Sequence, residues 1–323
     1  MEQKKLEKIC ILAAAAALVT LVGVYLVGKE QFTPRYWTFA GMAFGLMCMG
    51  SSVLLWKNRT GRKSAVVSVF AALSRYRFLI QQLVLRDFKT KYKRSSLGVL
   101  WSFLNPLLTM SVQYLVFSTL FHSDIPNFIL YLLIGIVCFN YFNEATSLTL
   151  ASIVGNASLI TKVYVPKFTF PLTRVISSTI NFLIALVPIC IVMLLTGAPI
   201  SPALLLLPIP ALCLFCLCLG VGMLLAASMV FFRDTQFLWG VISMVWMYAT
   251  PIFYPASIIP ARLQPLFRCN PMYQVIRFFR VILMDGVSPE PMAYVSLLIF
   301  TLAPLCLGLL VFKKTQDQFV LYL

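Results

Sequence analysis

The side chains of this sequence that could perform acid–base or ion-transfer chemistry are few and widely spaced. The chain has 323 residues but only ten acids and one histidine, His122, which is most simply structural. Glu144 is the one acid that falls well inside a long apolar run. Such a residue can mark an ion pathway, but one carboxylate is a thin basis for an ion-coupled pump. A satisfied polar contact between packed helices explains Glu144 at least as well.

The nine cysteines do not form a convincing metal or disulfide pattern. Cys213, Cys216 and Cys218 superficially resemble a metal knuckle, but they lie within an apolar run, with no second ligand pair and no histidine nearby. Packing as small hydrophobic residues explains them better. Cys269 stands alone in a loop. The sequence also lacks a Gly-x-x-x-x-Gly-Lys-Ser/Thr phosphate loop, a dinucleotide fingerprint and a Ser/His/Asp pattern. We therefore expect no catalytic, metal-binding or cofactor-binding residues in this chain.

The elements that must position the remaining polar groups are membrane-spanning helices. The composition is 60% hydrophobic and 11% charged, which is typical of an all-α polytopic membrane protein. The first apolar run resembles a signal peptide but is longer than one and lacks a cleavage site, so a retained anchor fits better. Eight runs are long enough to cross roughly 30 Å of hydrocarbon, and they lie near 9–27, 36–56, 100–121, 128–149, 171–196, 203–231, 236–253 and 291–312.

The distribution of cations predicts that both termini are cytoplasmic. The net charge of +16 could suggest nucleic acid, but most of the 26 Lys and Arg residues flank apolar runs, where they determine topology and contact anionic lipid. We therefore expect membrane lipids and no nucleic acid as partners. Eleven of these cations lie between Trp56 and Trp101, against one acid, Asp87: Lys57, Arg59, Arg62, Lys63, Arg75, Arg77, Arg86, Lys89, Lys91, Lys93 and Arg94.

The end of this basic stretch has the pattern of an amphipathic helix. Apolar residues recur at helical spacing at Leu79, Ile80, Leu83, Val84, Phe88 and Tyr92. Arg86, Lys89, Lys93 and Arg94 occupy the other side. A solvated topology signal would explain the charges but not the ordered stripe, so we predict an elbow helix in the membrane interface. Gly98 and Pro106 then allow the chain to turn and the next span to bend.

The loop between the runs 128–149 and 171–196 predicts a short cytoplasmic helix. Asn156 is a good helix cap, and Val165-Pro166 disfavours continuation. The intervening two turns present Leu159, Ile160, Lys162 and Tyr164. Apolar residues on so short a helix need a covering surface. That surface is either a partner protein or the bundle itself, and the pattern alone favours neither.

The segment from Tyr254 to Pro291 is expected on the outer side. Asn270-Pro271 is a favourable helix start. The apolar run Met272–Met284 is too short to cross a membrane, so it should be re-entrant or interfacial. Arg277 and Arg280 lie one turn apart on it. They either meet phosphate groups of a lipid or lipid-linked substrate or extend to the headgroups.

Several motifs together resemble the membrane subunit of polysaccharide-exporting ABC transporters of the O-antigen, capsule and teichoic acid type. The strongest is Arg86-Asp-Phe-Lys-Thr-Lys-Tyr-Lys-Arg-Ser-Ser-Leu-Gly-Val-Leu-Trp-Ser-Phe-Leu-Asn-Pro-Leu. Asn156…Leu159-Ile-Thr-Lys-Val-Tyr-Val-Pro166, Phe231-Phe-Arg-Asp, Thr250-Pro-Ile-Phe-Tyr-Pro255 and Asn270-Pro-Met-Tyr follow in the family's order. The resemblance runs from about residue 70 to the end.

This resemblance implies a six-span core (residues 71–323) that forms a homodimer in the cytoplasmic (inner) membrane of a bacterium. Two copies of a separate P-loop ATPase would bind ATP and Mg²⁺ and dock on Asn156, Leu159, Ile160, Lys162, Tyr164 and Pro166. It also implies an elbow that includes Arg86, Asp87, Phe88, Lys91, Tyr92 and Arg94, and external re-entrant helices with Arg277 and Arg280. An aromatic-lined channel would pass a lipid-linked glycan, with candidates Trp101, Phe103, Tyr114, Tyr131, Phe139, Tyr141, Phe142, Trp239 and Trp246.

The N-terminus departs from the family pattern, because residues 1–70 add a two-span hairpin. Three alternatives to glycan export stay open from the sequence. The same fold could export drugs or small lipids, the chain could be a transferase acting on lipid-linked sugars, or it could be a scaffold. A transferase would need grouped acids or histidine, whereas Glu30, His122, Asp124, Asp285 and Glu290 lie in separate outer loops.

Overall fold

The computed structural model describes residues 75–93, 95–121, 126–162 and 165–323, and every regular element in these ranges is helical. The chain divides into a unit that ends at Gln81 and a unit from Gln82 to Leu323. The account below concerns the second unit. The predicted hairpin with spans 9–27 and 36–56 lies outside the described residues, as do Arg94, His122 and Tyr164.

Five helices are long and apolar enough to cross a membrane, counted over the described residues. They correspond to five of the six spans expected after residue 71, so the chain is a multi-pass membrane protein. These helices are α5 (Leu100–Phe121), α6 (Phe128–Leu150), α8 (Thr169–Leu195), α9 (Pro208–Phe231) and α13 (Pro291–Thr315), with the 3-10 turn η2 (Pro202–Leu206) leading into α9.

The sixth expected span is shorter than the sequence predicted. Helix α10 covers Thr235–Ala249, which is 15 residues, whereas the apolar run continues to Phe253. Thr250 takes an extended conformation because Pro251 follows it. At 1.5 Å per residue, α10 is about 22 Å long and falls short of the roughly 30 Å hydrocarbon core. The prediction of helix over 250–253 is therefore wrong, and a six-span count stays a prediction.

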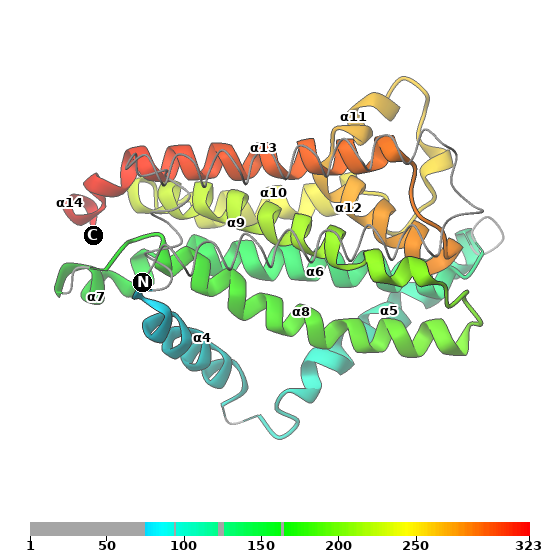
Figure 1. Cartoon of the computed structure of the whole chain (residues 1–323), viewed down its shortest axis with the longest axis horizontal. Helices are drawn as coiled ribbons and strands as arrows, with labels where there is room; N and C mark the ends of the chain where they lie inside the picture. The colour runs from blue at the N-terminus through cyan, green and yellow to red at the C-terminus, as the bar shows by residue number, and fades with distance from the viewer. Residues whose placement is uncertain (1–74, 94, 122–125, 163–164) are drawn as a thin grey trace, which may run out of the picture. The chain divides into compact units, whose positions relative to one another are not determined.

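Helix α6 forms the centre of the packed core. It contacts α5, α8 and α9, and most of its residues from Phe128 to Leu150 are buried. Figure 1 shows α6, α8, α9 and α13 running along a common direction. A helix that is largely apolar can be buried on most sides, and α6 has this character except where its polar residues, such as Asn140 and Asn143, are exposed.

Two glycines allow α9 and α13 to approach at backbone distance. A Cβ atom added at Gly220 would lie 2.5 Å from the backbone N and Cα of Leu305, and one added at Gly308 would lie 2.2 Å from the Gly220 carbonyl oxygen. Small residues allow such close crossings between membrane helices. The α9–α13 contact is also the most extensive between any two helices of the described chain.

Shorter elements occupy the two ends of the bundle. Figure 1 places α7 (Ala157–Lys162) and α14 (Phe319–Tyr322) at one end and α11 (Gln264–Arg268) at the other. Helix α4 (Arg77–Tyr92) precedes α5, and the 3-10 turn η1 (Val154–Asn156) precedes α7. The segment from Tyr254 to Pro291, which we call the outer segment after the side predicted for it, contains η3 (Ala256–Ile258), α12 (Pro271–Arg280) and a π-helical turn, η4 (Val281–Asp285).

Candidate functional site

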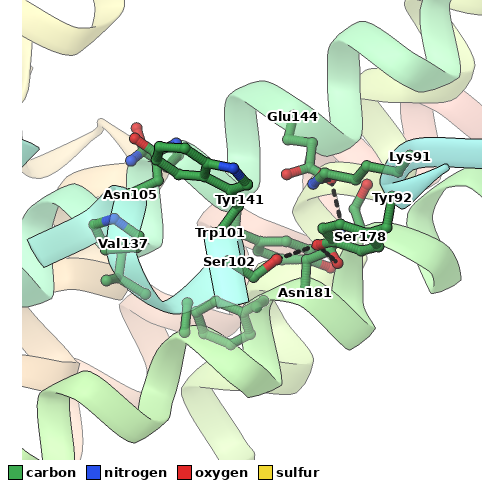
Figure 2. A pocket seen from close by; sticks show the side chains of 14 residues that line it. Lys91, Tyr92, Trp101, Ser102, Asn105, Val137, Tyr141, Glu144, Ser178 and Asn181 are labelled. Carbon is green, nitrogen blue, oxygen red and sulfur yellow. Dashed lines mark hydrogen bonds and ion pairs between the residues drawn. The ribbon is translucent and has the colours of Figure 1, made fainter. Parts of the chain in front are cut away.

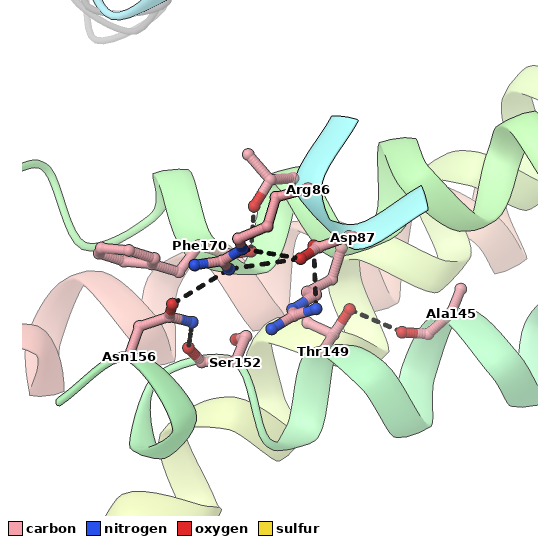
Figure 3. A network of polar contacts seen from close by, with 9 residues as sticks. Arg86, Asp87, Ala145, Thr149, Ser152, Asn156 and Phe170 are labelled. Carbon is pink, nitrogen blue, oxygen red and sulfur yellow. Dashed lines mark hydrogen bonds and ion pairs between the residues drawn. The ribbon is translucent and has the colours of Figure 1, made fainter. Parts of the chain in front are cut away.

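A buried carboxylate joins α4 to α8. The Asp87 side chain is 8% exposed, and its Oδ2 lies 2.9 Å from Arg174 Nη1 of α8. Its Oδ1 lies 3.3 Å from Nη2 of Arg86, the preceding residue. Figure 3 shows Asp87 among these polar groups. A buried charge needs such pairing to offset its loss of hydration, so Asp87 fixes where α4 packs.

Arg86 extends the same network to the turn before α7. Its Nη2 donates a hydrogen bond to Asn156 Oδ1 at 3.3 Å, and Asn156 Nδ2 donates to the Ser152 carbonyl at 2.7 Å (Figure 3). Helix α7 begins at Ala157, directly after Asn156, so the predicted start is confirmed. The buried Asn156 side chain does not make the expected cap and instead links α4 to the end of α6. The polar contact with Arg86 replaces the capping role.

Helix α7 packs against the protein through one side only. Ile160 is 8% exposed, whereas Leu159 is half-buried and Lys162 is exposed. The alternative of packing back onto the bundle is thus confirmed for Ile160. The outward side of α7 consists of Ser158, Thr161 and Lys162. Pro166 follows the helix, as the sequence predicted.

Part of the apolar stripe of α4 faces protein, while two of its cations, Arg86 and Lys91, turn to polar partners on other helices. Leu83 and Val84 are buried, Phe88 and Tyr92 are half-buried, and Lys89 is exposed. The rings of Phe88 and Tyr92 make an edge contact with centroids 5.0 Å apart. The helix is therefore confirmed and Leu83 and Val84 of its stripe are buried, while its amphipathic elbow role and its position in the membrane interface stay predictions.

Glu144 makes a polar contact between packed helices, one of the two interpretations that the sequence left open. Its Oε1 lies 2.8 Å from Lys91 Nζ of α4 and accepts a hydrogen bond from Asn181 Nδ2 of α8 at 2.8 Å. The Tyr92 hydroxyl donates to Asn181 Oδ1 at 2.9 Å and also contacts the Ser102 hydroxyl of α5. Figure 2 shows these side chains converging on one cavity of about 130 Å³. Four helices, α4, α5, α6 and α8, contribute to its wall.

The outer segment is held by Arg280 near the end of α12. Its Nη1 donates to the Pro251 carbonyl at 2.7 Å, and its Nη2 donates to the carbonyls of Tyr131 and Ile252 at 3.2 and 3.1 Å. The guanidinium carbon lies 3.3 Å from the centre of the Tyr131 ring. Burial lowers the pKa of Arg280 to about 10, so the group stays charged at neutral pH.

The same segment contains a second polar link and a second cavity. The Asn270 side chain accepts from Met272 N at 3.0 Å, which confirms the predicted helix start at Asn270-Pro271, and it also accepts from Trp246 Nε1 at 2.9 Å. Arg277 is exposed and lines a cavity of about 230 Å³ with Gln274 and Glu290. Arg277 and Arg280 thus have different surroundings, although the sequence analysis predicted the same role for both.

Residues 78–284 match the family model described as ABC-2 type transporter. The chain belongs to this family. The match includes α4, the polar network at Asp87, the cavity at Glu144 and the outer segment up to η4.

Three similar proteins illustrate the relationship. The O-antigen export system permease protein RfbA of Klebsiella pneumoniae is 30% identical over 72% of this chain and 90% of its own length. RfbA of Myxococcus xanthus is 27% identical over 79% of this chain and 98% of its own length. The polysialic acid transport protein KpsM of Escherichia coli is 22% identical over 74% of this chain and 93% of its own length.

The aromatic residues proposed to line an ABC-2 channel lie mostly inside the single chain. Phe142 packs edge-on against Trp239 and Trp246, with ring centroids 6.1 and 5.1 Å apart. Tyr141 stacks with Phe182 at 4.7 Å. Phe103 and Tyr114 are half-buried and Trp101 is 45% exposed, while Tyr131 and Phe139 are buried. A channel-lining role stays a prediction for all of them, and Trp101 is the most exposed of the set.

Three polar residues of this ABC-2 chain were missed from the sequence. Arg174, Asn181 and Ser102 all lie in apolar helices and complete the networks around Asp87 and Glu144. Their position inside apolar runs could have pointed to them, because polar side chains within membrane spans usually pair with one another. No group of three His, Cys, Asp or Glu side chains that could hold a metal occurs in the part of the chain that the structure describes.

Proposed function

We propose that this chain is the membrane subunit of an ATP-driven exporter of a lipid-linked polysaccharide. The family assignment and the polysaccharide named for its relatives support the substrate class. The observation that carries the proposal is the placement of α7, whose Ile160 is anchored while Ser158, Thr161 and Lys162 remain outward. A separate P-loop ATPase subunit would cover this face and supply the energy.

The Arg86–Asn156 contact supports a coupling role for α7. It links the turn before α7 to α4, and Asp87 links α4 to α8. A movement imposed on α7 by ATP binding in the partner would therefore reach α4 and α8 through charged hydrogen bonds, which are stronger than neutral ones. Lys91 would carry the same movement to Glu144 of α6.

We propose that the end of the bundle with α7 faces the cytoplasm, and that two copies of this chain form the transporter with two ATPase subunits. Exposed cations at this end, Lys89, Lys162, Lys313 and Lys314, support the orientation. The exposed apolar face of α10, which includes Phe237, Val241 and Val245, supports either lipid or a second copy as its neighbour.

The test is affinity purification of the tagged full chain from its native membrane in mild detergent. A P-loop ATPase is expected at one copy per chain. Lys162→Glu should reduce its recovery at least several-fold, because the outward face of α7 changes charge. Lys313→Glu is the matched control, since it reverses an exposed cation at the end of α13 without touching α7. Recovery of the chain alone, under conditions that preserve other complexes, would contradict the proposal.

The substrate class needs a separate measurement. Deleting the gene should remove the polysaccharide from the cell surface and leave it inside the cell, bound to its lipid. A cell that keeps its surface polysaccharide and instead loses export of a drug or small lipid would support the alternative substrate class.

A further inference from the structure

The cavity at Glu144 has a chemical character that its role as a helix joint does not explain. Besides the hydrogen-bonded set, its wall contains the exposed amides of Asn105 and Asn140 and the hydroxyl of Ser178. The Ser178 hydroxyl is buried and has no hydrogen-bond partner among the described residues. These groups can donate and accept hydrogen bonds, and buried polar groups normally have partners.

The charges in the cavity cancel. Lys91 and Glu144 are paired at 2.8 Å, with side chains 40% and 31% exposed, and they are the two charged residues of the lining. A phosphate group would have no unpaired cation to bind, because Lys91 is paired with Glu144. A metal ion would have only one carboxylate ligand. The remaining polar groups are amides and hydroxyls, which favour an uncharged ligand with many hydroxyl groups.

Aromatic rings form the other part of the wall. Trp101 is 45% exposed, and Tyr141 stacks with Phe182. A wall of apolar rings with a few directed polar groups is typical of small-molecule sites. The cavity of about 130 Å³ is also close to the roughly 150 Å³ that accommodates a benzene ring. A sugar ring with its hydroxyl groups is larger than benzene, so one edge of a single six-membered ring would enter, on the side where Trp101, Asn105 and Asn140 are exposed.

We propose that this cavity binds one neutral six-membered sugar ring of the exported glycan. The proposal rests on the proposed function and adds a binding site within one chain. Asn105 and Asn140 would hydrogen-bond the ring hydroxyls, and Trp101 would contact its apolar face. Because Lys91 and Tyr92 of α4 also form the wall, occupation of the cavity would hold α4 against α6 and α8.

The test uses the complete transporter in lipid nanodiscs and, as probe, the delipidated glycan isolated from the producing cells. Binding is measured by equilibrium dialysis. Asn140→Leu should raise the dissociation constant roughly tenfold, because it removes the hydrogen bonds of one amide. Asn143→Leu is the control, since it changes an exposed amide three residues further along α6 that does not line the cavity.

Tryptophan fluorescence provides a second measurement that keeps the test valid if Asn140→Leu fails to fold. Glycan should change the tryptophan fluorescence of the wild-type transporter, and Trp101→Phe should remove most of that change while leaving the dissociation constant within about threefold. Equal binding by wild type, Asn140→Leu and Asn143→Leu would overturn the sugar site. That result is distinct from failure of the proposed function, in which deleting the gene leaves the surface polysaccharide unchanged.

Discussion

Two charged side chains of the described residues, Asp87 and Arg280, hold neighbouring elements together near opposite ends of the bundle. Asp87 lies between two arginines at the end that carries α7, and Arg280 donates to three carbonyl oxygens in the outer segment. Both groups are paired with partners in other elements, so Asp87 fixes where α4 packs and Arg280 fixes the irregular segment at Pro251 and Ile252. Two substitutions measure how much they contribute.

Replacing Asp87 with Asn should destabilise the transporter. The change leaves the Arg174 cation, whose side chain is 22% exposed, without its carboxylate, at a cost of about 1–3 kcal/mol. Thermal unfolding of the purified transporter would measure the loss. Asp317→Asn is the control, because Asp317 is exposed at the same end and its loss should stay within about 0.5 kcal/mol. Equal unfolding temperatures for both variants would exclude a structural role for the Asp87 pairs.

Replacing Arg280 with Lys should loosen the outer segment although the charge is kept. An ammonium group cannot reproduce the planar set of donors that reaches the carbonyls of Tyr131, Pro251 and Ile252. Hydrogen–deuterium exchange over residues 251–254 should become at least several-fold faster. Arg277→Lys, one turn earlier and exposed, should leave the rate unchanged. Similar acceleration by both variants would argue against the Arg280 contacts.

At the scale of elements, the helix crossing between α9 and α13 depends on glycine. Gly220→Ala places a methyl group against the backbone of Leu305, and overpacking of this kind costs about 1–3 kcal/mol. The expected result is a lower unfolding temperature and a smaller yield of folded protein. Gly240→Ala is the matched control in α10, where an added Cβ meets nothing within 4 Å. It should be neutral or slightly stabilising, since alanine favours helix.

The sequence predicts where helices occur more reliably than it predicts where they end or which polar side chains pair. Apolar runs over 128–149 and 291–312 predicted α6 and α13 because their length and composition leave few alternatives. The end of the helix in the run 236–253 was predicted too late, because the residues stay hydrophobic up to Phe253 although Pro251 has already ended the helix. At Asn156 the helix start was predicted, but the partner of its side chain was missed, because Arg86 is 70 residues away and local capping rules contain no such contact.

At the scale of the whole molecule, Cys269 reports which side of the membrane the outer segment occupies. It is exposed and lies between α11 and α12. A membrane-impermeant maleimide should label it in right-side-out vesicles, and Cys269→Ser should remove that signal. Exposed Cys190 and Cys306 lie within spanning helices and should react poorly in lipid. Labelling of Cys269 confined to inside-out vesicles would reverse the orientation.

The contact between α9 and α13 also has a genetic consequence. A large side chain that clashes with another side chain can be rescued by a smaller residue opposite it. At Gly220 the atoms that would be struck belong to the main chain of Leu305 and Pro304, which every amino acid carries. Selection for suppressors of Gly220→Ala should therefore yield true revertants, or changes that shift a whole helix, and no single compensating substitution on α13.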